Sequence, residues 1–251
     1  MTMRSILHRA RTLLGLPPRH EPRPPSQPHW RNLLGLERRP IRTVIDIGAF
    51  DGDTAKFFRQ RFPLATIHCF EPQPQQFQAL QAWASTQGDR VVCHGCALGD
   101  QPGRATLHIN AQEPGRSTLL SALSEAMPQA HPLTETEVGV AVARLDEVMS
   151  TWPPLVEEIL VKIDTEGYDK QVIHGGMDTL RRAVGCIVEV HLSRRQAGQT
   201  TLGEMMQLMA DANLHYAGNV HQSIRRTGTV GYVDAVFMRQ EVLWQAPPSP
   251  A

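Results

Sequence analysis

The sequence has no long hydrophobic run, few cysteines and almost no lysine. None of its apolar stretches approaches the roughly 18 residues that a transmembrane helix needs, so no such helix is predicted. Only Lys56, Lys162 and Lys170 are lysines, and 25 acids balance the 25 basic residues, so the net charge is zero. A neutral chain lacks the broad basic surface typical of nucleic-acid binding, and no nucleic-acid partner is expected. The four cysteines lie in or beside apolar stretches, which is typical of free thiols in a reducing, cytoplasmic protein.

The composition changes near residue 40. Residues 1–40 contain eight arginines and seven prolines but only two acids, and the pattern of residues 4–16 predicts a short amphipathic helix. We interpret 1–40 as an extension and linker, which is either a mobile tail or an arm that contacts an acidic membrane surface or a partner protein. Residues 241–251 are expected to form a polar tail.

Residues 41–240 predict one α/β domain, because short apolar runs alternate with helical stretches. This alternation predicts a Rossmann-like, mostly parallel sheet with helices on both faces. The stretch 111–138 has no clear periodicity, and we interpret it as a loop beside the substrate pocket. The expected strands are 43–47, 65–70, 91–94, 159–163, 186–190 and 233–238, with a further extended piece at 104–109, and the expected helices are 53–61, 74–87 and 202–212, with helical turns up to residue 180.

The first predicted strand ends in an acidic, glycine-containing loop, residues 46–54. In an open α/β sheet, ligands bind beyond the carboxyl ends of the strands. Gly48 allows the backbone to approach a ligand closely, but the loop has neither the dinucleotide glycine spacing nor a P-loop lysine. Its acids suit a ligand with positive charge and hydroxyls, such as S-adenosylmethionine, although a metal site or a helix cap remains an alternative. The predicted cofactor-binding residues here are Asp46, Gly48, Ala49 and Asp51.

The ends of the second and third strands supply further candidates for the cofactor. Glu71, followed by Pro72, lies about 20 residues beyond the glycine loop, where a Rossmann-like site binds the ribose hydroxyls. The alternative for Glu71 is a charge at a helix N-terminus. Ala97 and Leu98 occupy the position expected for contact with adenine, although such a segment is also common in turns.

The end of the fourth strand carries the densest cluster of charges, in residues 161–169. Charges beside a buried strand are costly unless they are paired or functional. We expect Asp164 and Glu166 to lie near each other at the mouth of the pocket, with Asp164 also contacting the cofactor. Lys162 is interpreted as a structural ion-pair partner.

Four segments together resemble the FkbM-type methyltransferases. They are Val44–Ala49, Phe70–Pro72, Ala97–Gly99 and Lys162–Gly167, which occur in this order within residues 43–237. The resemblance implies a seven-stranded, class I Rossmann-like fold and S-adenosylmethionine as methyl donor. It also implies an acceptor hydroxyl, often on a sugar, a glycan or a secondary metabolite. Phe50-Asp51 departs from the family pattern and leaves the role of Asp51 open.

Two sets of residues could activate an acceptor hydroxyl. Asp164 with Glu166 could act as a general base, or as ligands of a divalent cation such as Mg²⁺ that lowers the pKa of the hydroxyl. His191, which follows the fifth strand, is the other candidate base because an imidazole titrates near neutrality. The structural alternatives are a helix N-terminal acid for Glu166 and a hydrogen-bonded residue of the pocket wall for His191.

The sequence therefore predicts an S-adenosylmethionine-dependent O-methyltransferase that acts on a small-molecule or glycan hydroxyl. Two other functions stay open: a non-catalytic nucleotide-binding scaffold, and a methyltransferase that acts on nucleic acid or protein. The strand-end acids count against the scaffold, and the neutral charge counts against nucleic acid.

Overall fold

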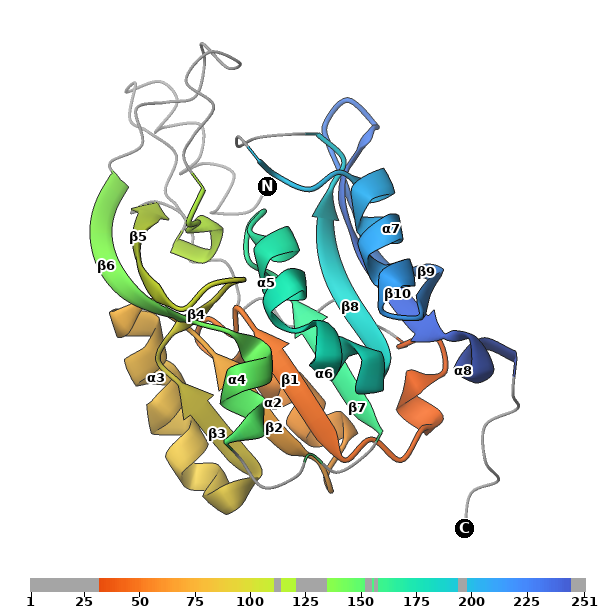
Figure 1. Ribbon diagram of the computed structural model, residues 1–251, viewed down its shortest axis with the longest axis horizontal. Coiled ribbons are helices and arrows are strands. Elements are labelled where there is room, and N and C mark those ends of the chain that lie inside the picture. The colour runs from red at the N-terminus through yellow and green to blue at the C-terminus, as the bar shows by residue number, and fades with distance from the viewer. Residues whose placement is uncertain are drawn as a thin grey trace, which may run out of the picture.

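A seven-stranded sheet forms the centre of the computed structural model, which describes residues 32–110, 114–120, 135–151, 155, 158–193 and 198–244 (Figure 1). The strand order is β3-β2-β1-β7-β8-β10-β9. β10 pairs antiparallel with both of its neighbours, and β3, β2, β1, β7 and β8 pair in parallel, as predicted. The strands are β1 (Thr43–Ile47), β2 (Thr66–Phe70), β3 (Val91–His94), β7 (Ile159–Ile163), β8 (Ala183–His191), β9 (Leu214–Ile224) and β10 (Val230–Arg239).

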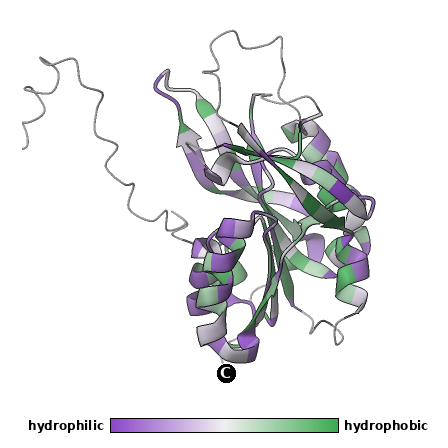
Figure 2. Ribbon diagram, turned by 90° about the vertical axis from the view of Figure 1, so that its left-hand side faces the viewer, coloured by the Kyte–Doolittle hydropathy of each residue, from purple (hydrophilic) through white to green (hydrophobic). Residues whose placement is uncertain are grey.

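Helices cover both faces of this sheet, as the alternation predicted. Every residue of β1 and β7 is buried, because both faces of these central strands are covered. The strands at the centre of Figure 2 are accordingly coloured mainly as hydrophobic. One apolar cluster packs against η1 (Leu36–Arg38), α2 (Asp53–Arg61), α3 (Pro74–Ala84) and α8 (Gln240–Trp244). The other packs against α4 (Leu145–Ser150), α5 (Asp169–Gly175), α6 (Met177–Arg182) and α7 (Leu202–Asp211).

A second, three-stranded sheet lies beside the carboxyl ends of the central strands (Figure 1). It consists of β4 (Ala97–Leu98), β6 (Glu135–Ala143) and β5 (Gly103–Asn110), in that order, and η3 (Pro114–Arg116) follows β5. Leu107, Val140 and Val142 contribute to its own small core. The stretch 111–138, which was interpreted as one long loop, therefore ends in a strand. Within it, residues 111–113 and 121–134 lie outside the described part of the chain.

The packed domain extends beyond the predicted limits on both sides. Leu33 and Leu36 are fully buried against the sheet, and α8 packs Val242 and Leu243 against the same core. The predicted helix at 4–16 and the tail after Trp244 lie outside the described residues, so the roles assigned to them remain predictions. In the described part of the chain, no helix is long and apolar enough to span a membrane.

Candidate active site

A cavity of about 250 Å³ lies at the carboxyl ends of β1, β2 and β7, with the second sheet on its far side. This is the edge where the sequence predicted a ligand. The predicted residues that line it are Gly48, Ala49, Asp51, Glu71, Pro72, Ala97, Leu98, Asp164 and Glu166. Asp46 and His191 were also predicted as site residues, but they do not line the cavity.

Gly48 brings the loop after β1 against the loop after β7. Its φ is 78°, and a Cβ built on it would lie 1.9 Å from the carbonyl oxygen of Asp164. The Asp164 amide donates to the Ile47 carbonyl over 3.0 Å, and the Gly48 and Ala49 amides both donate to the Phe70 carbonyl. Only glycine fits this position, and the resulting contact fixes the floor of the cavity.

Glu71 is held in place by two backbone amides. Its Oε2 accepts from the Phe50 amide over 2.8 Å, and its Oε1 accepts from the Gln73 amide over 2.7 Å. Burial raises the pKa of Glu71 to about 7, although these two hydrogen bonds oppose the shift. Each carboxylate oxygen can accept a further hydrogen bond, so Glu71 presents two fixed acceptors to the cavity. Phe50 takes a left-handed φ of 51° to reach Glu71, which is a strained conformation for a non-glycine residue.

Asp46 is buried next to the cavity and does not line it. It lies opposite Lys162 in the parallel register of β1 and β7, is fully buried, and its Oδ1 is 3.8 Å from the Lys162 Nζ. Burial raises the pKa of Asp46 to about 6. The contact of Asp46 with the cofactor stays a prediction, and in this structure its carboxylate lies near the buried Lys162.

Lys162 links Asp46 to the cavity. Its Nζ donates to Asp164 Oδ2 over 3.0 Å, and Lys162 itself lines the cavity. Burial lowers the pKa of Lys162, but Asp164 and Asp46 outweigh this effect and raise the pKa above its usual value. The ion-pair role predicted for Lys162 agrees with these contacts, whereas its position in the cavity wall was not predicted.

The loop after β7 is fixed from both ends. Asp169 Oδ1 accepts from the amide and the hydroxyl of Thr165, over 3.3 and 2.7 Å. The Thr118 hydroxyl donates to the Glu166 carbonyl over 2.9 Å, which ties the second sheet to this loop. Glu166 has a left-handed φ of 48°, and Gly167 follows with 98°. Left-handed backbone at a non-glycine residue costs about 1–3 kcal/mol, and such strain is concentrated at functional sites.

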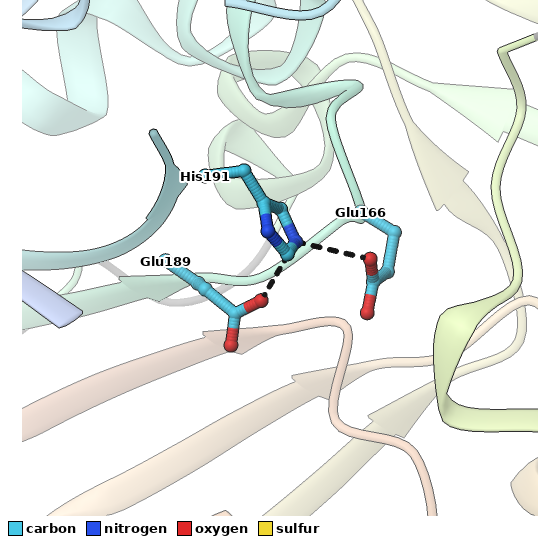
Figure 3. Close-up of side chains that lie close together, drawn as sticks. All are labelled: Glu166, Glu189 and His191. Atoms are coloured by element: carbon cyan, nitrogen blue, oxygen red, sulfur yellow. Dashed lines mark ion pairs between the residues drawn. The ribbon is translucent and has the colours of Figure 1, made fainter. Parts of the chain in front are cut away.

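Glu166, Glu189 and His191 form a compact cluster beside the cavity (Figure 3). His191 Nε2 lies 3.4 Å from Glu166 Oε2 and 3.2 Å from Glu189 Oε1. Burial raises the pKa of Glu189 above its usual value, and the negative charge of Asp164 adds to this shift. For His191, burial lowers the pKa, but the two carboxylates raise it to about 9 overall. The two carboxylates thus favour the protonated ring near neutrality, and the role of His191 as a general base stays a prediction.

Sequence reasoning missed Glu189 and Thr118. Glu189 precedes His191 by two residues on β8, so strand alternation places both side chains on one face, and this spacing was a readable signal. Thr118 reaches the site only because β5 and η3 fold back over it, and no local pattern reveals such a contact.

Comparison with known proteins places the chain in a family. Residues 46–216 match the methyltransferase FkbM domain. Methyltransferase 1 of Beauveria bassiana is 30% identical over 142 residues, which cover 53% of this chain and 57% of that protein. The 2-O-methyltransferase NoeI of Sinorhizobium fredii is 29% identical over 73% of this chain and 77% of its own length. The 31-O-demethyl-FK506 methyltransferase FkbM of Streptomyces tacrolimicus is 29% identical over 72% of this chain and 81% of its own length.

A solved structure supports the fold. The crystal structure of the FkbM methyltransferase from Methylobacillus flagellatus superposes with a TM-score of 0.50 at 12% identity, covering 80% of this chain and 44% of that one. The predicted family and the predicted Rossmann-like class I fold are confirmed. The predicted class of enzyme, an S-adenosylmethionine-dependent methyltransferase, is confirmed with them. The family match covers more than half of the chain, which therefore belongs to the FkbM family of methyltransferases.

Proposed function

We propose that this enzyme transfers the methyl group of S-adenosylmethionine to a hydroxyl of a sugar, a glycan or a secondary metabolite. The observation that carries the proposal is the cavity itself, which is lined by both Glu71 and Glu166 at the carboxyl ends of the strands. The names of two relatives, a 2-O-methyltransferase and a 31-O-demethyl-FK506 methyltransferase, support an oxygen acceptor.

The donor would lie along the loops after β1, β2 and β3. The free acceptor positions of Glu71 suit the two ribose hydroxyls. Ala97 and Leu98 line the cavity beside the second sheet and suit contact with adenine. Asp51 and Asp164 supply negative charge for the ammonium and sulfonium groups.

The acceptor would enter beside Glu166. S-adenosylmethionine would supply the methyl group, which would bond to the acceptor oxygen as the C–S bond breaks and its electron pair passes to sulfur. The hydroxyl proton passes to the Glu166 carboxylate, which faces the cavity, whereas His191 lies behind it. Alignment of the reactants can supply up to about 7–11 kcal/mol, and the base a further factor of about 10²–10⁴.

The first test is a calorimetric titration with S-adenosylhomocysteine, with NAD as the control ligand. We expect micromolar affinity for S-adenosylhomocysteine alone, and a loss of at least about tenfold in Glu71→Ala, because a buried hydrogen-bonded partner is worth about 1.5 kcal/mol or more. Glu137→Gln, on the exposed part of β6, is the matched control. A folded protein that does not bind S-adenosylhomocysteine would favour the scaffold alternative.

The acceptor is tested after the donor. Asp164→Ala and Glu166→Gln should lower turnover with hydroxylated acceptors by about 10²-fold or more. Glu166→Gln should leave affinity for S-adenosylhomocysteine within a factor of about three, since Glu166 is assigned to the acceptor end. Methyl transfer to RNA or protein substrates, with none to hydroxylated small molecules or glycans, would overturn the assignment. All four cysteines are free, which supports a reducing, cytoplasmic setting for this activity.

A further inference from the structure

We propose that Glu166, Glu189 and His191 form a binding site for one divalent transition-metal cation, such as Mn²⁺ or Zn²⁺. One ligand atom from each side chain lies within 4.8 Å of the other two. Figure 3 shows both carboxylates facing the His191 ring, each joined to it by an ion-pair line. The location of the cation follows from the cluster alone, whereas its role in catalysis rests on the proposed function.

The distances in the cluster match those between ligands that share one metal ion. Zinc binds histidine nitrogen and carboxylate oxygen at about 2.0–2.2 Å, so two such ligands lie about 2.8–3.6 Å apart in tetrahedral or octahedral geometry. His191 Nε2 is 3.4 Å from Glu166 Oε2 and 3.2 Å from Glu189 Oε1. The site can therefore be completed with small movements of these side chains.

The His191 ring is buried without the hydrogen bonds that a buried imidazole normally makes. Its side chain is 5% exposed, and among the described residues neither ring nitrogen has a hydrogen-bond partner. Nε2 lies close to both carboxylates, yet it makes a well-directed hydrogen bond to neither of them. A cation between the three groups would give Nε2 and both carboxylates a partner.

The surrounding charges favour a cation. Asp164, Glu166 and Asp234 all act on Glu189 as like charges. The buried lysine of this region, Lys162, is already paired with Asp164 and lies near Asp46. A divalent ion between Glu166, Glu189 and His191 would bring two positive charges to these carboxylates.

The ligand set also indicates which metal would bind. Mg²⁺ prefers six oxygen ligands, whereas an imidazole with carboxylates suits Zn²⁺, Mn²⁺ and related ions. The sequence predicted Mg²⁺ on Asp164 and Glu166, but Asp164 accepts a hydrogen bond from Lys162 over 3.0 Å. The geometry therefore moves the predicted site from Asp164 to Glu189 and His191, with Glu166 as the shared ligand.

A cation held here would act at the acceptor end of the cavity. Three protein ligands leave coordination positions open, and Glu166 is the ligand that lines the cavity. An acceptor oxygen in an open position would have a lower pKa. One oxygen of Glu166 would bind the cation, and the other would take the hydroxyl proton as the O–C bond forms and the C–S bond breaks.

The test is metal binding by the full chain, without cofactor or acceptor. Protein stripped with a chelator is titrated with Mn²⁺, Zn²⁺ or Mg²⁺ and followed by calorimetry, and Mn²⁺ binding is also followed by electron paramagnetic resonance. We expect one Mn²⁺ or Zn²⁺ per chain at micromolar affinity, proton release at pH 7, and at least tenfold weaker binding of Mg²⁺.

Variants assign the binding to the three residues. Glu189→Gln and His191→Ala should each weaken Mn²⁺ binding by at least about 30-fold. Glu166→Gln should weaken it as well, and because Glu166 lies on a loop, this variant is the least exposed to loss of the fold. Glu137→Gln tests another carboxylate that lies near a histidine, 3.6 Å from His108, and it should leave binding unchanged.

Two results would overturn the metal site: no bound Mn²⁺ or Zn²⁺ in protein that circular dichroism shows to be folded, or equal binding by wild type and all three cluster variants. The first result would identify the cluster as an ion-paired imidazolium. Titration with S-adenosylhomocysteine in the presence of chelator separates this failure from failure of the proposed function, because donor binding does not require the cation.

Discussion

A single carbonyl group decides how closely the loops after β1 and β7 approach each other. The Asp164 carbonyl occupies the space that a side chain at position 48 would need, and the left-handed backbone of Gly48 excludes other residues as well. Because this contact shapes the cavity floor, adding a single Cβ at position 48 would disturb the site. Several other described glycines, in contrast, have open space where a Cβ would lie.

Gly48→Ala should therefore lower the free energy of unfolding by more than about 3 kcal/mol, as a combined clash and backbone strain. Gly203→Ala is the control, because nothing lies within 4 Å of a Cβ at that position in helix α7. Urea unfolding should show the control variant at least as stable as the wild type, since alanine favours a helix. Equal stability of both variants would mean that the loops can separate at little cost.

Asp169 gives a prediction for the pH dependence of stability. Burial raises the pKa of Asp169 to about 6, although the hydrogen bonds from Thr165 oppose the shift. The folded state therefore holds the proton more tightly than the unfolded chain, whose pKa is about 3.8. As the pH rises between these two values, the folded state loses stability relative to the unfolded state, and above pH 6 the loss is complete.

Asp169→Asn should remove this part of the pH dependence, because an amide does not titrate and its oxygen can still accept from Thr165. A shift of about two units corresponds to about 3 kcal/mol at most. We expect the variant to gain stability relative to the wild type between pH 4.5 and pH 7.5, measured by urea unfolding at both values. A constant difference across this range would show that Asp169 titrates alike in both states.

At the scale of the element, helix α7 begins with a reciprocal cap. The Thr201 hydroxyl accepts from the Glu204 amide over 3.3 Å, and Glu204 Oε2 accepts from the Thr201 amide over 2.8 Å. This cap fixes the start of the helix that packs against β8 and β9 and buries Met205 and Met209 in the core. The sequence pattern Thr-x-x-Glu is typical of a capping box.

Thr201→Ala should lower the free energy of unfolding by about 1 kcal/mol, because the Glu204 amide loses its acceptor. Thr201→Ser keeps the hydroxyl and should stay within about 0.5 kcal/mol of the wild type. Thermal unfolding with both variants separates loss of the cap from a general effect of substitution at this position. Equal midpoint temperatures for the alanine and serine variants would contradict a stabilising role of the cap.

Elements with a strong local pattern were predictable, and those that depend on distant partners were not. The apolar runs at 43–47 and 159–163 became β1 and β7 with the predicted bounds. Strand β9, Leu214–Ile224, was missed because its residues are mostly polar and half-exposed, and its pairing with β10 defines it. Strand β6 was missed although Val138, Val140 and Val142 alternate with other residues, which is the local pattern of a strand.

In the candidate site, too, residues marked by a local pattern were predictable and contacts with distant partners were not. Gly48, Glu71 and Asp164 follow strands directly, so the topology rule placed them at the cavity. Asp46 and His191 lie within strands, at positions where the direction of a side chain decides which face it meets. The sequence could not show that Asp46 would lie beside Lys162 and outside the cavity lining, or that two glutamates would raise the pKa of His191, because both effects depend on burial and on neighbours across the sheet.

At the scale of the whole molecule, two apolar layers enclose a charged seam. The two large apolar clusters lie on opposite faces of the sheet, and the buried ionisable groups gather where the parallel strands end. Lys162 lies at the centre of this seam, 5% exposed and paired with carboxylates. The other two lysines differ: Lys56 is partly exposed on α2, and Lys170 is exposed on α5.

This scarcity of lysine makes the folded enzyme suited to directed chemical attachment. An amine-reactive ester should modify Lys170 and Lys56 at pH 8 but leave Lys162 unmodified until urea unfolds the chain, because its ammonium stays charged and buried. Peptide mass spectrometry would show the three positions separately, and early labelling of Lys162 would contradict its pairing. With Lys56→Arg, the described domain would keep one reactive side-chain amine, at Lys170, so that a dye or a surface could be joined to the enzyme at a single known side chain.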